Sequence, residues 1–377
     1  MGYRLTDMKY GDSGSTTPKG NDGHGVALPH HADAREDVSA SYVVRKYGIL
    51  LRVFSLKDNP WLRFFRVPNL TTVPGDALAG AAFMMPAGDE TLPQAFAAAV
   101  GVLFMYMFGL ADNDVVGARA DAENAPDRPI PRGEISQSVA LVAMFACLGA
   151  AFFLPNWILG LVSPGTRMPV VWTASMMMLL GCVCAYNRLK WPSLMGACRG
   201  FSVLCGGMAT WITDVHPYTH EMLPESDWLL LSLSVMVGGW TAYIQAVAKL
   251  SEGKERPSEG LGNRRFLLGL SAFMPLLAFA VIAVAPGMTY ASGMLLVLPV
   301  AGCCCTFLAW CFAVDPLWMA HGPPERRRAV GKTIDALIYL QIGFMLIVPR
   351  PSFLAAAVGL WLANRLIRRL LPHASGM

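Results

Sequence analysis

Residues 92–111 read LPQAFAAAVGVLFMYMFGLA, and residues 112–133 continue with DNDVVGARADAENAPDRPIPRG. The first stretch has no charged side chain, and its length is what a helix needs to cross the hydrocarbon core of a bilayer. The second stretch is rich in acidic residues and arginine, which the hydrocarbon core would exclude. This order predicts a membrane-spanning helix that ends in a polar loop at one membrane face.

The composition extends this interpretation to the whole chain. Of its 377 residues 54% are hydrophobic and only 15% are charged, whereas soluble domains carry about 25% charged residues. The charged residues gather in the N-terminal region and in short loops between apolar runs. This pattern excludes a disordered chain, a soluble enzyme domain and a small disulfide scaffold. It predicts an all-α, polytopic membrane helix bundle.

Apolar runs of spanning length recur along the chain. We expect nine transmembrane helices and consider a tenth. The predicted spans lie at 72–87, 92–111, 136–154, 169–186, 194–212, 228–248, 266–285, 291–314 and 333–349, with the tenth candidate at 352–367. Residues 1–60 are predicted to be a polar leader, partly disordered and with an amphipathic helix near its end, and residues 61–372 to be the transmembrane domain.

The loops between the spans differ in basic residues. One alternate set holds 14 lysines and arginines, and the other holds only Arg167 and Arg350. The positive-inside rule therefore predicts that the leader and the Asp-rich loop are cytoplasmic in a multi-pass protein of the cell membrane. Membrane lipids are expected partners. Nucleic acid is not, because no basic tract with interleaved aromatic residues occurs.

The loop after the second span combines hard oxygen ligands with basic side chains. Asn113, Gly117 and Asp121 follow one another at intervals of four residues, which places them on one face if the helix continues. Carboxylate and amide oxygens suit Mg²⁺ that is also bound by substrate phosphates. Arg128 adds a donor for anions. The alternative interpretation is a solvated loop that only connects two helices.

The same loop resembles a known motif. Asn113-Asp114 with Asp121, followed by the run Asp127-Arg128-Pro129-Ile130-Pro131, resembles the first aspartate-rich motif of the UbiA superfamily of intramembrane prenyltransferases. Residues 66–70 and 77–80 resemble the start of its first helix, and residues 186–190 resemble its Tyr…Lys loop. Residues 195–200 resemble the fifth helix of a bacterial branch that includes the UbiA-like protein of the ebo gene cluster. The resemblance covers about residues 60–350.

The resemblance implies a helix bundle around a central cavity, in which Mg²⁺ and basic side chains bind a prenyl diphosphate. The isoprenoid group would pass to an aromatic or other small acceptor. The residues implied are Asn113, Asp114, Asp121 and Tyr186 for catalysis, Arg128, Lys190, Arg199 and Lys254 for diphosphate binding, and Asn113, Asp121, Glu252 and Glu255 for the metal.

Three positions depart from the family pattern. Gly117 stands where an aspartate is expected, and the loop at 249–263 has Glu252 and Glu255 in place of a second Asp-x-x-x-Asp motif. Asp76 stands where the first helix commonly has an asparagine, and an ionisable residue within a span is a candidate for lining the cavity. Two alternatives therefore stay open: a lipid-binding or transport component without transferase activity, and a terpene cyclase of the same fold.

Overall fold

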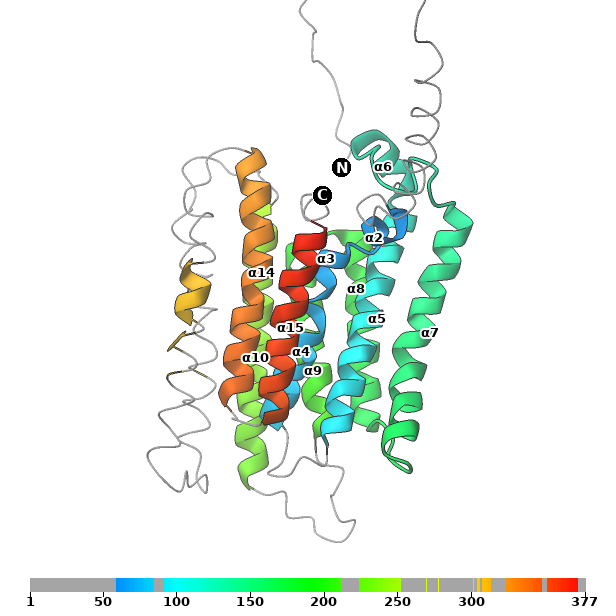
Figure 1. Cartoon of the computed structure of the whole chain (residues 1–377). Helices are drawn as coiled ribbons and strands as arrows, with labels where there is room; N and C mark the ends of the chain where they lie inside the picture. The colour runs from blue at the N-terminus through cyan, green and yellow to red at the C-terminus, as the bar shows by residue number, and fades with distance from the viewer. Residues whose placement is uncertain are drawn as a thin grey trace, which may run out of the picture. The chain divides into compact units, whose positions relative to one another are not determined.

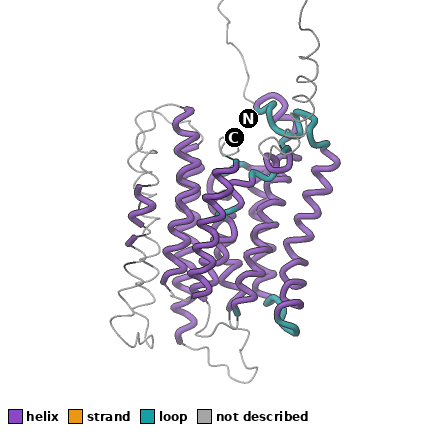
Figure 2. Tube along the Cα trace, in the orientation of Figure 1, coloured by secondary structure: helices purple, strands orange, loops and turns teal. Residues whose placement is uncertain are grey.

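The structure is a computed structural model. It describes residues 59–84, 91–211, 224–251, 323–347 and 351–371, together with short stretches between 269 and 312. Every regular element within these ranges is a helix (Figure 2). Nearly all of the predicted leader lies outside the described residues. So does most of the predicted spans at 266–285 and 291–314.

The other eight predicted spans coincide with helices (Figure 1). These are α4 (Val73–Met84), α5 (Leu92–Val116), α7 (Gln137–Val162), α8 (Val170–Leu189), α9 (Pro192–Thr210), α10 (Pro224–Ser251), α14 (Pro323–Ile347) and α15 (Pro351–Leu370). Three short helices, α2 (Pro60–Phe64), α3 (Val67–Leu70) and α6 (Ala118–Asn124), complete the described set. Within the described residues, α5, α7, α8 and the Leu230–Ala248 part of α10 are long and apolar enough to cross a membrane.

Helix α5 runs beyond its predicted end at residue 111. It continues to Val116 and carries Asp112 and Asp114 inside its last turns, where both side chains are buried. Gly117 caps the helix through its N–H, which bonds to the Asn113 carbonyl at 2.9 Å, and α6 begins at the next residue. Helices α5 and α6 are therefore separate elements that meet at Gly117, and the bond from Asp121 N–H to the Gly117 carbonyl at 2.9 Å continues the helical pattern across the junction. A Cβ on Gly117 would lie 3.4 Å from Asp121 Oδ2, so positions 117 and 121 lie on the same side, as the spacing predicted.

Helix α9 packs between α4 and α10 at very short range. A Cβ atom on Gly206 would lie 1.8 Å from the Ala77 carbonyl oxygen of α4, and one on Gly196 would lie 2.3 Å from the Thr241 carbonyl oxygen of α10. Glycines allow such approach between helix backbones, which is a common way to pack helices in membranes. This packing brings Arg199, on the same helix, against α4.

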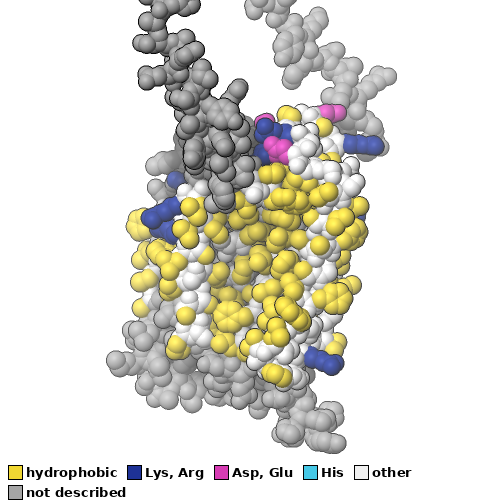
Figure 3. Space-filling model, turned by 45° about the vertical axis from the view of Figure 1, so that its right-hand side comes forward, with side chains coloured by type: hydrophobic (Ala, Val, Ile, Leu, Met, Phe, Trp, Pro, Cys, Tyr) yellow, Lys and Arg dark blue, Asp and Glu magenta, His cyan; other side chains and the backbone are white. Residues whose placement is uncertain are grey.

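The outer flank of the bundle is apolar. Large side chains of α7 are largely exposed, including Val142 at 70%, Phe153 at 77% and Trp157 at 63%. The face in Figure 3 shows hydrophobic side chains along the helices and charged side chains gathered near their ends. Because water would disfavour so much exposed apolar surface, this flank fits contact with lipid chains.

Candidate functional site

A cavity of about 460 Å³ opens within the bundle. Its polar lining comes from the ends of α5 and α8 and the segments that adjoin them. Its apolar lining comes from within the long helices. The main polar lining residues are Arg66, Asn113, Asp121, Arg128, Asn187 and Lys190, and the main apolar ones are Tyr106, Leu110, Val183, Ile244, Ile334 and Leu337. The cavity thus joins a charged end, here called the polar mouth, to an apolar interior.

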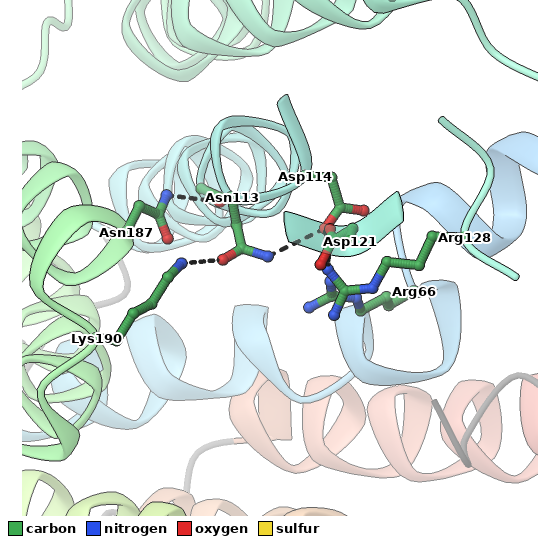
Figure 4. A network of polar contacts seen from close by, with 8 residues as sticks. Arg66, Asn113, Asp114, Asp121, Arg128, Asn187 and Lys190 are labelled. Atoms are coloured by element: carbon green, nitrogen blue, oxygen red, sulfur yellow. Dashed lines mark hydrogen bonds and ion pairs between the residues drawn. The ribbon is translucent and has the colours of Figure 1, made fainter. Parts of the chain in front are cut away.

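Asp114 is the buried centre of the polar mouth. Its Oδ1 accepts hydrogen bonds from Arg66 Nη2 at 2.7 Å and from Asn113 Nδ2 at 3.0 Å (Figure 4). Arg128 Nη1 lies 3.5 Å from the same oxygen. Arg66 precedes α3 in the left-handed conformation, with φ of 46°, and from there its side chain reaches α5. Asp114 therefore holds two guanidinium groups at the cavity.

Arg128 also forms an ion pair with Asp121, so it bridges the end of α5 and helix α6 (Figure 4). Its loop is closed by local backbone bonds, including Arg132 N–H to Arg128 O at 3.0 Å. Arg63 of α2 holds the same loop through the Asp127 carbonyl at 3.4 Å and an ion pair with Glu134. The loop that the sequence singled out is thus folded against the bundle.

Lys190 approaches the mouth from the end of α8. It adopts the left-handed conformation, with φ of 56°, and its backbone N–H bonds to the Tyr186 carbonyl at 2.8 Å. Its Nζ donates to Asn113 Oδ1 and lies 5.5 Å from the centre of the Tyr186 ring. Burial lowers the pKa of the Lys190 ammonium, and the carboxylates of Asp112 and Asp121 partly oppose that shift. The lysine therefore lies at the exposed rim of the mouth, with its ammonium over the Tyr186 ring.

The charges of the polar mouth balance. Among the described residues, three cations (Arg66, Arg128 and Lys190) face three carboxylates (Asp112, Asp114 and Asp121). A bound diphosphate would add negative charge to this neutral set. Additional positive charge is then needed to stabilise it.

The described part of the mouth fits one magnesium ion only if the substrate supplies further ligands. In the described residues, no three His, Cys, Asp or Glu side chains lie together in a way that could hold a metal ion. Asn113 and Asp121 offer one amide and one carboxylate oxygen to the cavity. Mg²⁺ commonly takes one or two carboxylates plus substrate phosphates and water, so this donor set suits it. Glu252, Lys254 and Glu255 lie outside the described residues.

A second charged group lies deeper in the bundle. Arg199 Nε is 2.8 Å from Asp76 Oδ2, and the Asp76 side chain is fully buried. Asp76 Oδ1 also accepts hydrogen bonds from Trp240 Nε1 at 2.9 Å and from Gln341 Nε2 at 2.6 Å. The sequence predicted that Asp76 would line the cavity. In the structure Arg199 lines it, and Asp76 lies behind Arg199 as its partner.

The sequence-predicted residues within the described ranges come together. Asn113, Asp121, Arg128, Tyr186, Lys190 and Arg199 all line the cavity, and Asp114 lies directly behind Asn113 and Arg128. Sequence reasoning missed Arg66, Asp112 and Asn187 as members of the site. Asp112 and Asn187 were detectable as polar residues at the ends of apolar helices. Arg66 lies far from the motif in sequence, and it was noted only within residues 66–70, which resemble the start of the family's first helix.

Comparison with known proteins fits this geometry. The model of the UbiA prenyltransferase family matches residues 76–322, which is more than half of the chain. The chain belongs to the UbiA prenyltransferase family. As a UbiA-family protein with apolar spanning helices, it is an integral membrane protein. No curated protein matches the sequence at a significant level.

One solved structure resembles the UbiA-family chain. It comes from a structural study of a digeranylgeranylglyceryl phosphate synthase in membranes. The two chains are 14% identical, and the match covers 78% of this chain and 99% of the other, with a TM-score of 0.45.

Proposed function

We propose that the protein is a membrane prenyltransferase that binds a prenyl diphosphate in the cavity and transfers the isoprenoid group to a small acceptor. Family membership supports prenyl transfer in general. The observation that carries the proposal for this chain is one cavity that joins a polar mouth to an apolar interior. A prenyl diphosphate is built in the same way: its charged head matches the polar mouth, and its hydrocarbon tail matches the apolar interior.

The diphosphate binds at the mouth. Arg66, Arg128 and Lys190 supply N–H donors, and each is held in place by a carboxylate or amide on α5 or α6. Guanidinium groups bind phosphate oxygens with two parallel hydrogen bonds. When the diphosphate arrives, it replaces the Asn113 and Asp121 oxygens as the partner of these cations, and this exchange frees both oxygens for a metal ion.

Magnesium would be held by Asn113 and Asp121, with Glu252 and Glu255 as further candidates. When bound, it supplies the positive charge that the neutral mouth lacks and stabilises the leaving diphosphate. The proposed requirement for Mg²⁺ therefore follows from the balance of charges at the mouth. Gly117 offers no side-chain oxygen, so the site holds its metal with fewer protein ligands than the family pattern provides.

The reaction breaks the bond between the allylic carbon and the diphosphate oxygen, and the electron pair leaves with the diphosphate. The resulting carbocation lies between the mouth and the interior, where Tyr106 and Tyr186 line the cavity. Aromatic faces stabilise cations, and an apolar lining excludes water that would trap the cation as an alcohol. A nucleophilic atom of the acceptor then bonds to the carbon and releases a proton.

The test is release of diphosphate from labelled prenyl diphosphates by the purified protein, with Mg²⁺ and a panel of acceptors. We expect Mg²⁺-dependent release that Asp121→Asn lowers by about tenfold or more. Glu123→Gln is the matched control, because Glu123 is exposed on the same short helix. Prenylated acceptor supports transfer. Cyclic hydrocarbon in its place identifies a terpene cyclase, and no release with any substrate contradicts the proposal.

A further inference from the structure

The last two turns of α15 carry three arginines, only one of which packs against a neighbouring helix. Arg368 forms an ion pair with Asp335 of α14, and its Nε donates to Asn364 Oδ1 at 3.3 Å. Arg365 and Arg369 are exposed. Among the residues that the structure describes, no carboxylate pairs with either of these two arginines. One of the three charges is therefore neutralised within the bundle, and two lie at the surface without a counter-charge.

Exposed leucines lie on the same side of α15 as the two exposed arginines. Leu362 is 53% exposed and Leu366 is 58% exposed. Arg365 and Arg369 follow Leu362 by three and seven residues, which is the spacing of one helix face. Leu366 lies on that face between the two arginines. These four residues, here called the Arg–Leu stripe, thus join an apolar surface to two guanidinium groups.

The stripe runs toward the end of the bundle where the polar mouth lies. Thr71, at the end of α3, donates from Oγ1 to Asn364 Oδ1 at 2.8 Å, and this bond holds α15 beside the segment that begins at Arg66. Figure 1 shows the last turn of α15 at the end of the bundle where α2 and α3 lie. The two exposed arginines therefore lie toward the same membrane face as the polar mouth.

The depth of the stripe matches the boundary between lipid headgroups and acyl chains. Helix α15 ends at Leu370, so Arg365 lies roughly 8 Å before that end at the usual rise per residue. The long side chain of an arginine spans such a depth, with its stem among acyl chains and its guanidinium near the headgroups. Arg365 Cζ lies 5.1 Å from the centre of the Trp361 ring, and tryptophan is enriched at this boundary in membrane proteins. The stripe thus presents its charges at the level of the headgroup phosphates.

The chemistry of the stripe selects one kind of occupant. Two cations without a counter-charge beside an apolar region favour an anion, because a low dielectric strengthens the attraction. Guanidinium groups bind phosphate oxygens with paired hydrogen bonds. The exposed leucines add contact for a hydrocarbon chain, which a free phosphate ion lacks. A zwitterionic headgroup brings its own cation, which the two arginines would repel, so an anionic headgroup fits better.

We propose that the Arg–Leu stripe binds an anionic phospholipid. Arg365 and Arg369 hold its headgroup phosphate, and Leu362 and Leu366 pack against one of its acyl chains. None of these four residues lines the cavity. The site is therefore separate from the proposed prenyl diphosphate site, and it does not depend on the proposed prenyltransferase function.

The test compares two lipids with identical acyl chains, dioleoylphosphatidylglycerol and dioleoylphosphatidylcholine. Their equilibrium binding to the full-length protein in detergent is measured by native mass spectrometry. We expect the wild-type protein to bind the anionic lipid about tenfold more tightly, because each basic residue near a headgroup favours it several-fold. Glycerol phosphate carries a phosphate without acyl chains and should not compete at equal concentration. Equal binding of the two lipids, or competition by glycerol phosphate, overturns the proposal.

Arg365→Gln with Arg369→Gln tests the location of the site. It should lower the preference for the anionic lipid to about twofold or less. Arg119→Gln with Arg167→Gln is the matched control, because it removes two charges from exposed residues on other segments, and it should keep the preference. Arg365→Lys with Arg369→Lys keeps both charges and should retain most of the preference. The proposal is overturned if the glutamine variant keeps the full preference, or if the control or the lysine variant loses as much as the glutamine variant.

The single variants cover the case in which the double glutamine variant does not fold. Arg365→Gln and Arg369→Gln should each lower the preference for the anionic lipid by about threefold. Each should keep the wild-type melting temperature in the absence of added lipid, because both side chains are exposed. A preference that is unchanged in both single variants overturns the proposal.

Discussion

Asn187 Nδ2 donates a hydrogen bond to Asp112 Oδ2 over 2.7 Å, and this contact ties the last turn of α8 to that of α5. The same Nδ2 lies 2.9 Å from the Gly109 carbonyl oxygen. Replacing Asn187 by leucine leaves the buried Asp112 carboxylate without this donor. The free energy of unfolding should fall by about 1–3 kcal/mol, with a lower melting temperature in detergent. Ser234→Ala, on an exposed face of α10, is the control and should leave the melting temperature unchanged.

Arg128 should contribute strongly to substrate binding because it lines the cavity and bridges Asp114 and Asp121. In steady-state kinetics, Arg128→Gln should raise the KM for the prenyl diphosphate by about tenfold or more, as expected for a charge-assisted hydrogen bond. Arg119→Gln makes the same charge change at an exposed residue and should have little effect. If both substitutions raise the KM equally, the effect comes from the loss of surface charge, and Arg128 has no special role in binding.

Gly117 should limit how tightly the metal is held. Its φ of −81° suits any residue, but a Cβ there would lie 2.8 Å from the Asn113 carbonyl oxygen, so the backbone at the end of α5 must shift to admit it. Gly117→Asp should lower the Mg²⁺ concentration needed for half-maximal diphosphate release by several-fold, because it adds a carboxylate ligand. Gly117→Ala adds the same Cβ without the ligand. If alanine gives the same change, the carboxylate is not a ligand.

The lowered pKa of Lys190 predicts a pH dependence of diphosphate binding. The anion binds the charged ammonium, so affinity should fall as the pH rises through the Lys190 pKa. Because burial lowers that pKa, the loss should begin at a lower pH than for an ordinary lysine. Lys190→Arg keeps the charge over this range and should move the loss to higher pH. The affinity of the wild-type protein and of Lys190→Arg for labelled diphosphate is measured across the alkaline pH range. If the two proteins lose affinity at the same pH, a group other than Lys190 titrates.

The close contact between α4 and α9 should tolerate no added volume. Gly206→Val places a branched side chain where even a Cβ would lie 1.8 Å from the Ala77 carbonyl oxygen. The helices would have to separate, which also disturbs the Asp76–Arg199 pair, so we expect loss of folded protein by size-exclusion chromatography. Gly160→Val on α7, where a Cβ meets nothing within 4 Å, should fold normally.

The long apolar runs made most of the described helices predictable. Spanning length and low charge placed eight helices, because a bilayer core admits few other backbone structures. The end of α5 was predicted too early, since Asp112 and Asp114 look like loop residues until their partners Asn187 and Arg66 are known. Those partners lie 75 and 48 residues away, so a local pattern could not reveal them.

The site was predictable where its residues form a motif. Asn113, Asp121 and Arg128 belong to one loop, and the structure brings their side chains to one cavity. The role of Asp76 as partner of Arg199 depends on the close packing of α4 on α9. The sequence predicted Asp76 as a residue lining the cavity and Arg199 as a diphosphate ligand, and no motif joined the two. The physical reason is that pairing within a bundle depends on helix packing, which the sequence alone does not specify.

The central claim is that one cavity holds the diphosphate at the polar mouth and the isoprenoid tail in the apolar interior. An experimental density map of the protein with Mg²⁺ and a non-reactive prenyl thiodiphosphate tests it most directly. We predict diphosphate density beside Arg66, Arg128 and Lys190, metal density at Asn113 and Asp121, and tail density along Tyr106 and Leu337. A diphosphate bound elsewhere, or a cavity filled only by lipid under these conditions, would contradict the account.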